Sequence, residues 1–316
     1  MLEIKNLTAG YQNQTIVNDI SFSVGEAEIV GIAGESGCGK STLLKSIVDL
    51  PGTGIVVTEG KILFKEKNLL ELSKREMRSI RGKDICMIFQ KAESAMDPVV
   101  KIGKQFYESM RVHNKEVKRQ EVYTLTKKIL EQLYFEDADR ILEAYPFEMS
   151  GGMNQRIALA MAMLNSPRVI LADEPTSALD VTVQSQVVRE MLDLRQNFGT
   201  SILIVSHNIN VLSSMADKLG VMYGGQMVEF GPKDEVIRHP AHPYTKVLLE
   251  AVPQMNGKLP EGITGQPPSF QEIGGGCRFA SRCAYRMEQC GRKRPKKRRS
   301  ADDHWYCCHR KRENFQ

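Results

Sequence analysis

The chain has 316 residues and a formal net charge of +5, with 41% hydrophobic and 26% charged residues. This length fits one large domain, or one domain with a small appendage, and the composition is that of a soluble globular protein. No apolar run approaches the roughly 18 residues of a membrane span, and the first residues lack the basic and apolar order of a signal peptide. We therefore expect a protein that stays in the cytoplasm and does not cross a membrane by itself.

The excess of positive charge lies in Arg292–Arg299, which reads RKRPKKRR. Such a run can attract nucleic acid or anionic lipid. A solvated basic loop is the simpler interpretation, and we expect no nucleic-acid partner.

Apolar and polar positions alternate over the first 30 residues, with turn signals at Gly10 and Gly25. This alternation is typical of strands with one buried face. We expect strands at Leu2–Ile4, Ile16–Val17, Ile20–Val24 and Glu28–Ile32.

The segment Gly34–Ser41 reads GESGCGKS and lies between the last of these strands and an apolar run with helical spacing. The pattern GxxxxGK[ST] in that context predicts a phosphate-binding loop, because its backbone N–H groups and the helix N-terminus create a positive field. Lys40 is expected to reach the β- and γ-phosphates of ATP, and Ser41 to ligate Mg²⁺. The expected nucleotide contacts are Gly34, Glu35, Ser36, Gly37, Cys38, Gly39, Lys40, Ser41 and Thr42.

A strand predicted at Ile85–Phe89 ends at Gln90, and the pattern is helical from about Ala92 to Leu164. Within this region, Ser150–Gly152 directly precedes a helical run and predicts a second helix N-terminus with backbone donors. A plain helix cap is the alternative, because serine caps helices well. Since the chain already has one phosphate loop, we interpret this turn as a site for ATP bound to a different subunit.

The apolar strand Val169–Ala172 leads into two carboxylates, Asp173 and Glu174. A buried strand of a parallel sheet places such residues at its carboxyl end, beside the phosphates. Asp173 is expected to hold Mg²⁺, usually through water, and Glu174 to polarise the attacking water as general base.

Beyond these acids, strands and helices continue to alternate, which predicts a mostly parallel sheet with helices on both faces. Prolines become frequent after residue 240, so we place a boundary near residue 250. The expected organisation is a nucleotide-binding domain at 1–250, with a helical subdomain at about 91–165, and an extension at 251–316. The later predicted elements are helix Val181–Arg195, strand Ile202–Val205 and helix Ile209–Ala216.

These motifs in this order resemble the ATP-binding-cassette (ABC) family, whose LSGGQ signature appears here as MSGGM at Met149–Met153. The resemblance implies an α/β P-loop ATPase with a parallel-sheet core, an antiparallel β subdomain, a helical subdomain and, here, a cysteine-rich extension. It implies that Tyr11 stacks on adenine and that Gln90 links Mg²⁺ and the attacking water to the transmembrane partner. His207 matches the histidine that contacts the γ-phosphate.

The loop Ser177–Asp180 resembles the family segment that crosses the interface between two cassettes, so Asp180 is included in the predicted nucleotide site. The resemblance implies a head-to-tail pair in which ATP on Lys40, Ser41 and Asp173 is closed over by Ser150–Gly152 of the other subunit. Glu174, His207 and Gln90 are the expected catalytic residues.

Three classes of cassette protein differ in how their chains are organised. Soluble cassettes of translation normally carry two cassettes in one chain, and this chain has one. DNA-repair and chromosome cassettes insert a long coiled coil or zinc modules between the phosphate loop and the signature, whereas about 110 residues without sustained heptads separate them here. A transporter ATPase is therefore favoured.

Two later stretches resemble oligopeptide and dipeptide importers and the related nickel importers: HPAHPYT at His239–Thr245 and GCRFASRC at Gly276–Cys283. The resemblance implies an ATPase that drives peptide import from the cytoplasmic face of the membrane as a peripheral subunit. A nickel or metal-complex importer and a non-transport cassette are the alternatives. Implied partners are a second homologous ATPase subunit, forming a heterodimer, two permease subunits and an extracytoplasmic substrate-binding protein.

Five of the seven cysteines crowd the last 40 residues, which in a cytosolic protein points to metal before disulfides. Their spacings differ from the Cys-x-x-Cys knuckles of structural zinc, and four thiolates on an irregular loop suit an iron–sulfur cluster. The resemblance to the importers implies a [4Fe–4S] cluster; zinc or a metal-free tail is the alternative, and Cys307 rivals Cys308 as the last ligand. The expected ligands are Cys277, Cys283, Cys290 and Cys308.

Overall fold

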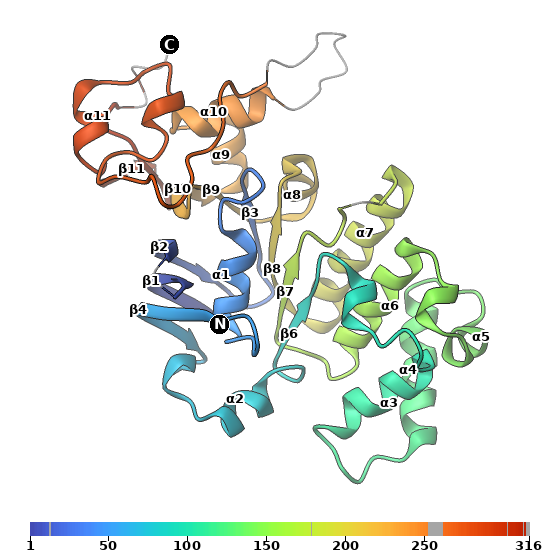
Figure 1. Cartoon of the computed structure of the whole chain (residues 1–316). Coiled ribbons are helices and arrows are strands. Elements are labelled where there is room, and N and C mark those ends of the chain that lie inside the picture. The colour runs from blue at the N-terminus through green and yellow to red at the C-terminus, as the bar shows by residue number, and fades with distance from the viewer. Residues whose placement is uncertain (13, 178, 252–261, 302, 312, 314–316) are drawn as a thin grey trace. The chain divides into compact units, whose positions relative to one another are not determined.

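The structure is a computed structural model that describes residues 1–12, 14–177, 179–251, 262–301, 303–311 and 313 (Figure 1). Ala178 of the predicted interface loop, and Pro253 and Pro260 near the predicted boundary, lie outside the described residues. The chain forms two compact units. Unit 1 consists of Met1–Val24, Ile29–Leu70 and Val205–Gln316, and unit 2 consists of Gly25–Glu28 and Glu71–Ile204.

The N-terminal part of unit 1 is a four-stranded antiparallel sheet in the order β2-β1-β4-β5. Leu2 and Ile4 of β1 are buried at alternate positions, as the sequence predicted, and Leu7 is buried after an irregularity in the pairing between Ile4 and Leu7. The two short strands predicted at Ile16–Val17 and Ile20–Val24 are one continuous strand, β2. The strands are β1 (Leu2–Tyr11), β2 (Gln14–Val24), β4 (Ile55–Phe64) and β5 (Lys67–Asn68).

A second sheet in unit 1 mixes parallel and antiparallel pairs. Strand β3 (Ile29–Ala33) pairs in parallel with β9 (Lys218–Tyr223), and β9 pairs antiparallel with β10 (Gln226–Pro232). Strand β10 then pairs with β12 (His304–Cys307), and β12 with β11 (Lys297–Ala301), both antiparallel. The C-terminal extension thus supplies two strands to this sheet.

Strand β11 corrects one expectation. The basic run Arg292–Arg299 was interpreted as a solvated loop, but its last three residues begin this strand. Lys297, Arg298 and Arg299 remain exposed, and the Lys297 ammonium lies 3.7 Å from the centre of the Trp305 ring on β12. The hairpin of β11 and β12 therefore leaves these three charged residues exposed, and β11 adds a strand to the sheet.

Short helices complete unit 1. Helix α1 follows β3 directly, and α8 packs on the same strand, where the Leu212 side chain lies beside Gly31. The helices are α1 (Lys40–Ile47), α8 (Ile209–Met215), α9 (Lys233–Arg238), α10 (Pro243–Glu250) and α11 (Glu288–Arg292), with a 3₁₀ turn at Ala280–Arg282.

Unit 2 combines buried strands with a helical region. Strand β6 (Ile85–Ile88) pairs in parallel with β7 (Val169–Asp173), and β8 (Ser201–Ser206) lies on the other side of β7 and continues into unit 1. Every residue of β7 and β8 is buried, which explains their continuous apolar sequences. The helices are α2 (Lys74–Ile80), α3 (Ile102–Arg111), α4 (Arg119–Gln132), α5 (Ala138–Glu143), α6 (Gly151–Met163) and α7 (Val181–Phe198).

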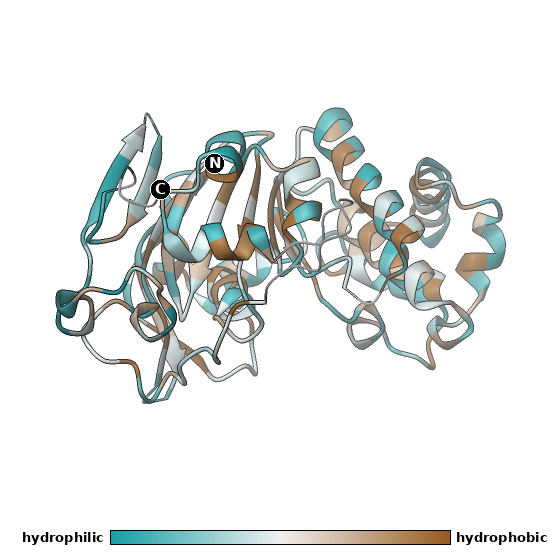
Figure 2. Ribbon diagram, turned by 90° about the horizontal axis from the view of Figure 1, so that it is seen from above, coloured by the Kyte–Doolittle hydropathy of each residue, from teal (hydrophilic) through white to brown (hydrophobic). Residues whose placement is uncertain are grey.

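The helical region between Ala92 and Leu164 is confirmed, with 3₁₀ turns at Ala92–Ala95 and Pro146–Glu148. Figure 2 shows brown and teal residues alternating around these helices, as expected where each helix buries one face. Helix α4, for example, buries Val122, Thr126 and Ile129 at helical spacing.

A buried ion pair fixes the helix that follows Ser150–Gly152. Arg156 on α6 donates from Nε to Oε1 of Glu190 on α7 at 2.6 Å, and its guanidinium also donates to the Leu133 carbonyl and lies 4.3 Å from the centre of the Phe135 ring. Burial raises the pKa of Glu190 to about 7, and Arg156 opposes that rise. Since breaking a buried pair leaves a charge unpaired at a cost of about 3 kcal/mol or more, the start of α6 is firmly positioned.

No helix in the described part of the chain is both long and apolar enough to span a membrane. The predicted α/β class is confirmed. The sheet is less parallel than expected, because β10, β11 and β12 add antiparallel pairs.

Candidate active site

The phosphate-binding loop predicted in unit 1 runs from the end of β3 to the start of α1. Gly39 precedes α1 with φ of 102°, a left-handed conformation that favours glycine. At Gly34 a Cβ atom would lie 2.3 Å from the Met222 carbonyl oxygen of β9, so only glycine fits at this position. These two glycines make the turn that brings the N-terminus of α1 back over the end of the strand.

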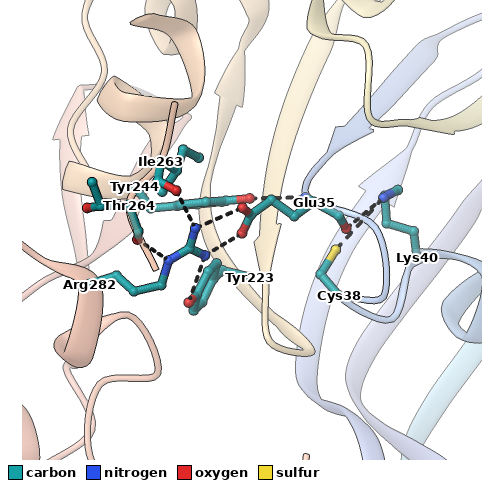
Figure 3. Close-up of polar contacts among 8 residues, drawn as sticks. All are labelled: Glu35, Cys38, Lys40, Tyr223, Tyr244, Ile263, Thr264 and Arg282. Carbon is teal, nitrogen blue, oxygen red and sulfur yellow. Dashed lines mark hydrogen bonds and ion pairs between the residues drawn. The ribbon is translucent and has the colours of Figure 1, made fainter. Parts of the chain in front are cut away.

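Lys40 is the first residue of α1, and its side chain folds back over the loop. Its Nζ donates to the carbonyl oxygens of Gly34 at 2.8 Å and Glu35 at 3.1 Å (Figure 3). Lys40 is only 4% exposed. An ammonium held inside a loop of backbone donors is suited to receiving phosphate oxygens.

Cys38 is a buried thiol inside the same loop. Its Sγ lies 4.0 Å from Lys40 Nζ, yet burial raises the pKa of the Cys38 thiol, an effect only partly offset by Lys40. The thiol is therefore protonated at neutral pH, and Cys38 packs as a small side chain.

Tyr11, the predicted adenine-stacking residue, ends β1 and is 37% exposed. It lines a cavity of 820 Å³ in unit 1. The sequence did not predict that the C-terminal extension also lines this cavity, although one of these residues, Arg278, lies in the GCRF stretch. Arg278 donates to the Gly224 carbonyl, and burial lowers the pKa of Arg278 to about 10. The extension residues are Phe270, Gln271, Ile273 and Arg278.

The two predicted carboxylates lie in unit 2 at the end of β7, where Asp173 is 4% and Glu174 8% exposed. Gln90 follows β6, the parallel neighbour of β7, so both strands deliver their end residues to the same edge. Gln90 Nε2 donates to Glu174 Oε2 at 3.4 Å. The structure thus brings together Gln90 and Glu174, two of the three predicted catalytic residues. A general base needs a neighbour of this kind to orient its carboxylate.

Glu174 has φ of 47°, a conformation that non-glycine residues rarely adopt. Backbone strain of this kind persists when the surrounding structure determines it, and it is frequent at active sites. Here Ser177 reinforces the turn, since its backbone N–H and its Oγ both donate to the Glu174 carbonyl.

The predicted second anion site, Ser150–Gly152, begins α6 in unit 2. Ser150 Oγ accepts from the Met153 N–H at 3.3 Å, so the helix-cap interpretation is correct. A cap does not exclude anion binding, because Ser150 and Gly151 are exposed at the positive end of the helix. A Cβ at Gly152 would lie 2.8 Å from a Val183 methyl group, which explains the second glycine.

The last two predicted site residues, Asp180 and His207, lie beside the ends of secondary-structure elements. Asp180 caps α7, its Oδ1 accepting from the N–H groups of Thr182 and Val183 at 3.0 Å each, so it has a structural role in unit 2. His207 is exposed in unit 1 and directly follows β8.

The predicted site residues divide between the two units of the chain. Unit 1 holds Tyr11, Gly34–Thr42 and His207, and unit 2 holds Gln90, Ser150–Gly152, Asp173, Glu174 and Asp180.

The cysteine cluster does not form a metal site in the conformation described. Among the described residues, no three His, Cys, Asp or Glu side chains lie close enough together to hold a metal ion. The thiols of Cys308, Cys290 and Cys283 nevertheless act on Cys277, because each adds to the effect of burial, which raises the pKa of Cys277 to about 12. Cys307 lines a cavity of 410 Å³ together with Arg294 and Lys297, and both cations act on its thiol.

Backbone N–H groups point at all four predicted ligands. The sulfurs of Cys277, Cys283 and Cys308 each accept from the N–H two residues later in the chain. Cys290 Sγ accepts from the Met287 N–H at 3.4 Å. Such bonds stabilise a thiolate over a thiol, but burial has the larger effect and raises the pKa of Cys277, Cys283 and Cys308. The backbone donors are those that a thiolate-bound metal group would use.

Residues 17–177 match the ABC transporter family, and residues 228–290 match the oligopeptide/dipeptide transporter C-terminal region. With the phosphate loop and the carboxylates of β7, these matches define an ABC-type P-loop ATPase that couples ATP hydrolysis to transport. The chain belongs to the ABC transporter family and carries the C-terminal region of its oligopeptide/dipeptide branch.

Curated relatives align over nearly the whole chain. The dipeptide transport ATP-binding protein DppD of Bacillus subtilis is 39% identical over 318 residues, covering 98% of this chain and 94% of the relative. The oligopeptide transport ATP-binding protein OppD of Haemophilus influenzae is 36% identical over 296 residues, covering 92% and 91%. These relatives confirm the importer subfamily that the sequence motifs predicted.

Among solved structures, the dimeric post-hydrolysis state of the ATP-binding cassette MJ0796 bound to ADP and Pi matches with a TM-score of 0.66 and 26% identity. The match covers 74% of this chain and 99% of that chain. This confirms the cassette fold.

Proposed function

We propose that this chain is the ATP-hydrolysing subunit of an importer that carries peptides across the cytoplasmic membrane and is bound to its cytoplasmic face. The observation that carries this proposal is the presence, in one chain, of an ordered phosphate loop and of the oligopeptide/dipeptide transporter C-terminal region. The relatives DppD and OppD are named as peptide transport proteins, so a nickel importer and a soluble cassette are not favoured.

Each side chain has a defined task in this reaction. Lys40 and the backbone donors of the loop bind the β- and γ-phosphates, while Tyr11 stacks on the adenine. Oxygens of Ser41, Asp173 and Gln90 are ligands of the kind that Mg²⁺ prefers. Glu174 accepts a proton from the attacking water, and the amide of Gln90 orients that carboxylate.

The site is completed by another subunit in this proposal. Ser150–Gly152 and Asp180 serve ATP bound to a second, homologous ATPase subunit, and His207 contacts the γ-phosphate in the chain's own site. The dimeric state of the related cassette MJ0796 supports such a pair. Two permease subunits and an extracytoplasmic binding protein complete the importer, with residues 1–250 as the cassette and 251–316 as an importer-type extension.

Replacing Lys40 tests the transport role. In the importer assembled with its permeases and binding protein, Lys40→Ala should abolish uptake of labelled peptide, because the phosphates lose the cation that binds them. Lys45→Ala, in the last turn of the same helix, should take up peptide at the parental rate. Parental uptake by Lys40→Ala would contradict the proposal.

We also propose that Cys277, Cys283, Cys290 and Cys308 hold an iron–sulfur cluster, with zinc as the alternative occupant. The four backbone bonds to these sulfurs support this assignment. They also favour Cys308 over Cys307, because the Cys308 sulfur accepts a backbone N–H from Arg310. A bound cluster would supply a one-electron centre and a cross-link within the extension, and its iron would keep the thiols deprotonated despite their burial.

Iron and acid-labile sulfide in anaerobically purified chain test this assignment. The parental chain should be brown and contain both, Cys308→Ser should lose most of the iron, and Cys307→Ser should retain it. A colourless, iron-free parental sample would overturn the cluster, and a sample with bound zinc in its place would establish the alternative occupant.

A further inference from the structure

Every polar group of Glu35, the second residue of the phosphate loop, is engaged by another part of unit 1. Its backbone N–H donates to the Tyr244 hydroxyl at 3.0 Å, and its carbonyl accepts from Lys40 Nζ at 3.1 Å. Its carboxylate accepts from both terminal nitrogens of Arg282, at 2.7 and 3.0 Å. Figure 3 shows these bonds converging on Glu35 from both sides.

Arg282 comes from the C-terminal extension, 247 residues further along the chain. Its side chain is only 4% exposed, and all five of its N–H groups have acceptors. Besides Glu35, these acceptors are the carbonyls of Thr264 and Ile263 and the Tyr223 hydroxyl. The bonds to Glu35 raise the pKa of Arg282. Lysine cannot reproduce this planar, two-pronged contact.

An aromatic cluster fixes both ends of this contact. The rings of Tyr223 and Tyr244 lie 4.6 Å apart, and Phe279 lies 5.2 Å from the first and 5.3 Å from the second. Tyr244 belongs to the HPAHPYT stretch, and Phe279 and Arg282 belong to GCRFASRC. The two stretches that resemble the peptide importers therefore meet at one residue of the phosphate loop.

We propose that Arg282 is a positioning residue of the ATP site: it neutralises Glu35 and fixes the loop that presents Lys40 to the phosphates. A carboxylate inside a phosphate-binding loop repels the incoming nucleotide unless a cation balances it. Arg282 supplies that cation from a fixed and nearly dry position. The bonds from Arg282 to Glu35 also hold in place the Glu35 carbonyl that accepts from Lys40 Nζ. The extension therefore sets both the shape and the charge of the phosphate-binding loop.

This role differs from simple stabilisation in one measurable way. If Arg282 only supported the fold, its loss would lower thermal stability and leave the ATP affinity of the folded fraction unchanged. If Arg282 offsets the charge of Glu35, its loss weakens ATP binding, and removal of the Glu35 charge restores part of that binding.

The test is a comparison of ATP affinities in the full-length chain, measured by calorimetric titration, with folding checked by thermal melting. Arg282→Met should weaken ATP binding about fivefold or more, the lower end of coupling between two sites. The double variant Arg282→Met/Glu35→Gln should bind ATP more tightly than Arg282→Met alone. The control Arg292→Met removes an exposed cation of the same extension, paired with Glu288, and should bind ATP as the parental chain does.

Unchanged affinity of folded Arg282→Met would overturn the inference, as would a double variant that binds no better than Arg282→Met. Should Arg282→Met fail to fold, Arg282→Lys is compared with Arg282→Gln. The cationic variant should then bind ATP more tightly, and equal affinities would overturn the inference. The inference rests on the proposed ATPase role, but its failure would be separate, because the parental chain would still bind ATP.

Discussion

At the scale of single residues, the site combines acids that were evident in the sequence with a contact that was not. Asp173 and Glu174 were predictable because an apolar strand that ends in two carboxylates has few other interpretations in a phosphate-loop protein. Arg282 could not be predicted, because its partner lies 247 residues away and the residues that distinguish the surrounding motif are its cysteines. Local patterns reveal residue types, whereas a long-range ion pair depends on how the chain folds back.

Glu174 is expected to be the general base of hydrolysis. In the assembled importer, Glu174→Gln should lower ATP turnover by about 100-fold or more, because the amide cannot accept the proton from water. Turnover is measured as phosphate release at saturating ATP. The control Glu136→Gln, at an exposed position of unit 2, should hydrolyse ATP at the parental rate. Parental turnover by Glu174→Gln would exclude this assignment.

At the scale of secondary structure, the start of α10 shows how a short sequence motif acts. His242 caps this helix, with Nδ1 accepting from the Tyr244 N–H at 3.0 Å. The imidazole also bonds to the Cys307 backbone, and the carboxylate of Glu229 accepts from the N–H groups of Ala241 and His242. These bonds aim the Tyr244 hydroxyl at Glu35. The sequence identified HPAHPYT as a family motif, but its task emerges from the packing.

The pH dependence of stability should report on His242. Burial lowers the pKa of His242 to about 3, from 6.5. A histidine whose pKa is lower in the folded state binds its proton more readily in the unfolded chain. The fold therefore loses stability as the pH falls below the pKa of that histidine in the unfolded chain. Between about pH 7.5 and about pH 5, this residue alone should remove about 2 kcal/mol from the free energy of unfolding.

Urea denaturation at several pH values measures this loss. His242→Asn keeps a capping oxygen but does not titrate, so its stability should fall less steeply over the same range, even if it is lower throughout. His239→Asn, at an exposed position three residues earlier, should keep the parental slope. A parental slope in His242→Asn would contradict the assignment.

At the scale of the whole molecule, the alternation of strands and helices was enough to predict the class of fold. The strands that complete the sheet in unit 1 were less accessible. Strands β9 and β10 lie in a region without chemical motifs, and β12 follows the irregular extension. Prolines mark a change in the chain near residue 250, yet strand pairing continues beyond it through Phe230 and Trp305. Strand pairing between distant segments leaves little trace in local sequence.

Strand β11 has a further consequence, for the solubility of the chain. It is the outermost strand of its sheet in the described part of unit 1, and an outer strand offers unpaired backbone groups to any neighbouring chain. Lys297, Arg298 and Arg299 are consecutive residues of this strand, directly after Pro295 and Lys296 in the sequence. Two such edges brought together would repel each other, so the basic run disfavours edge-to-edge pairing between copies of the protein.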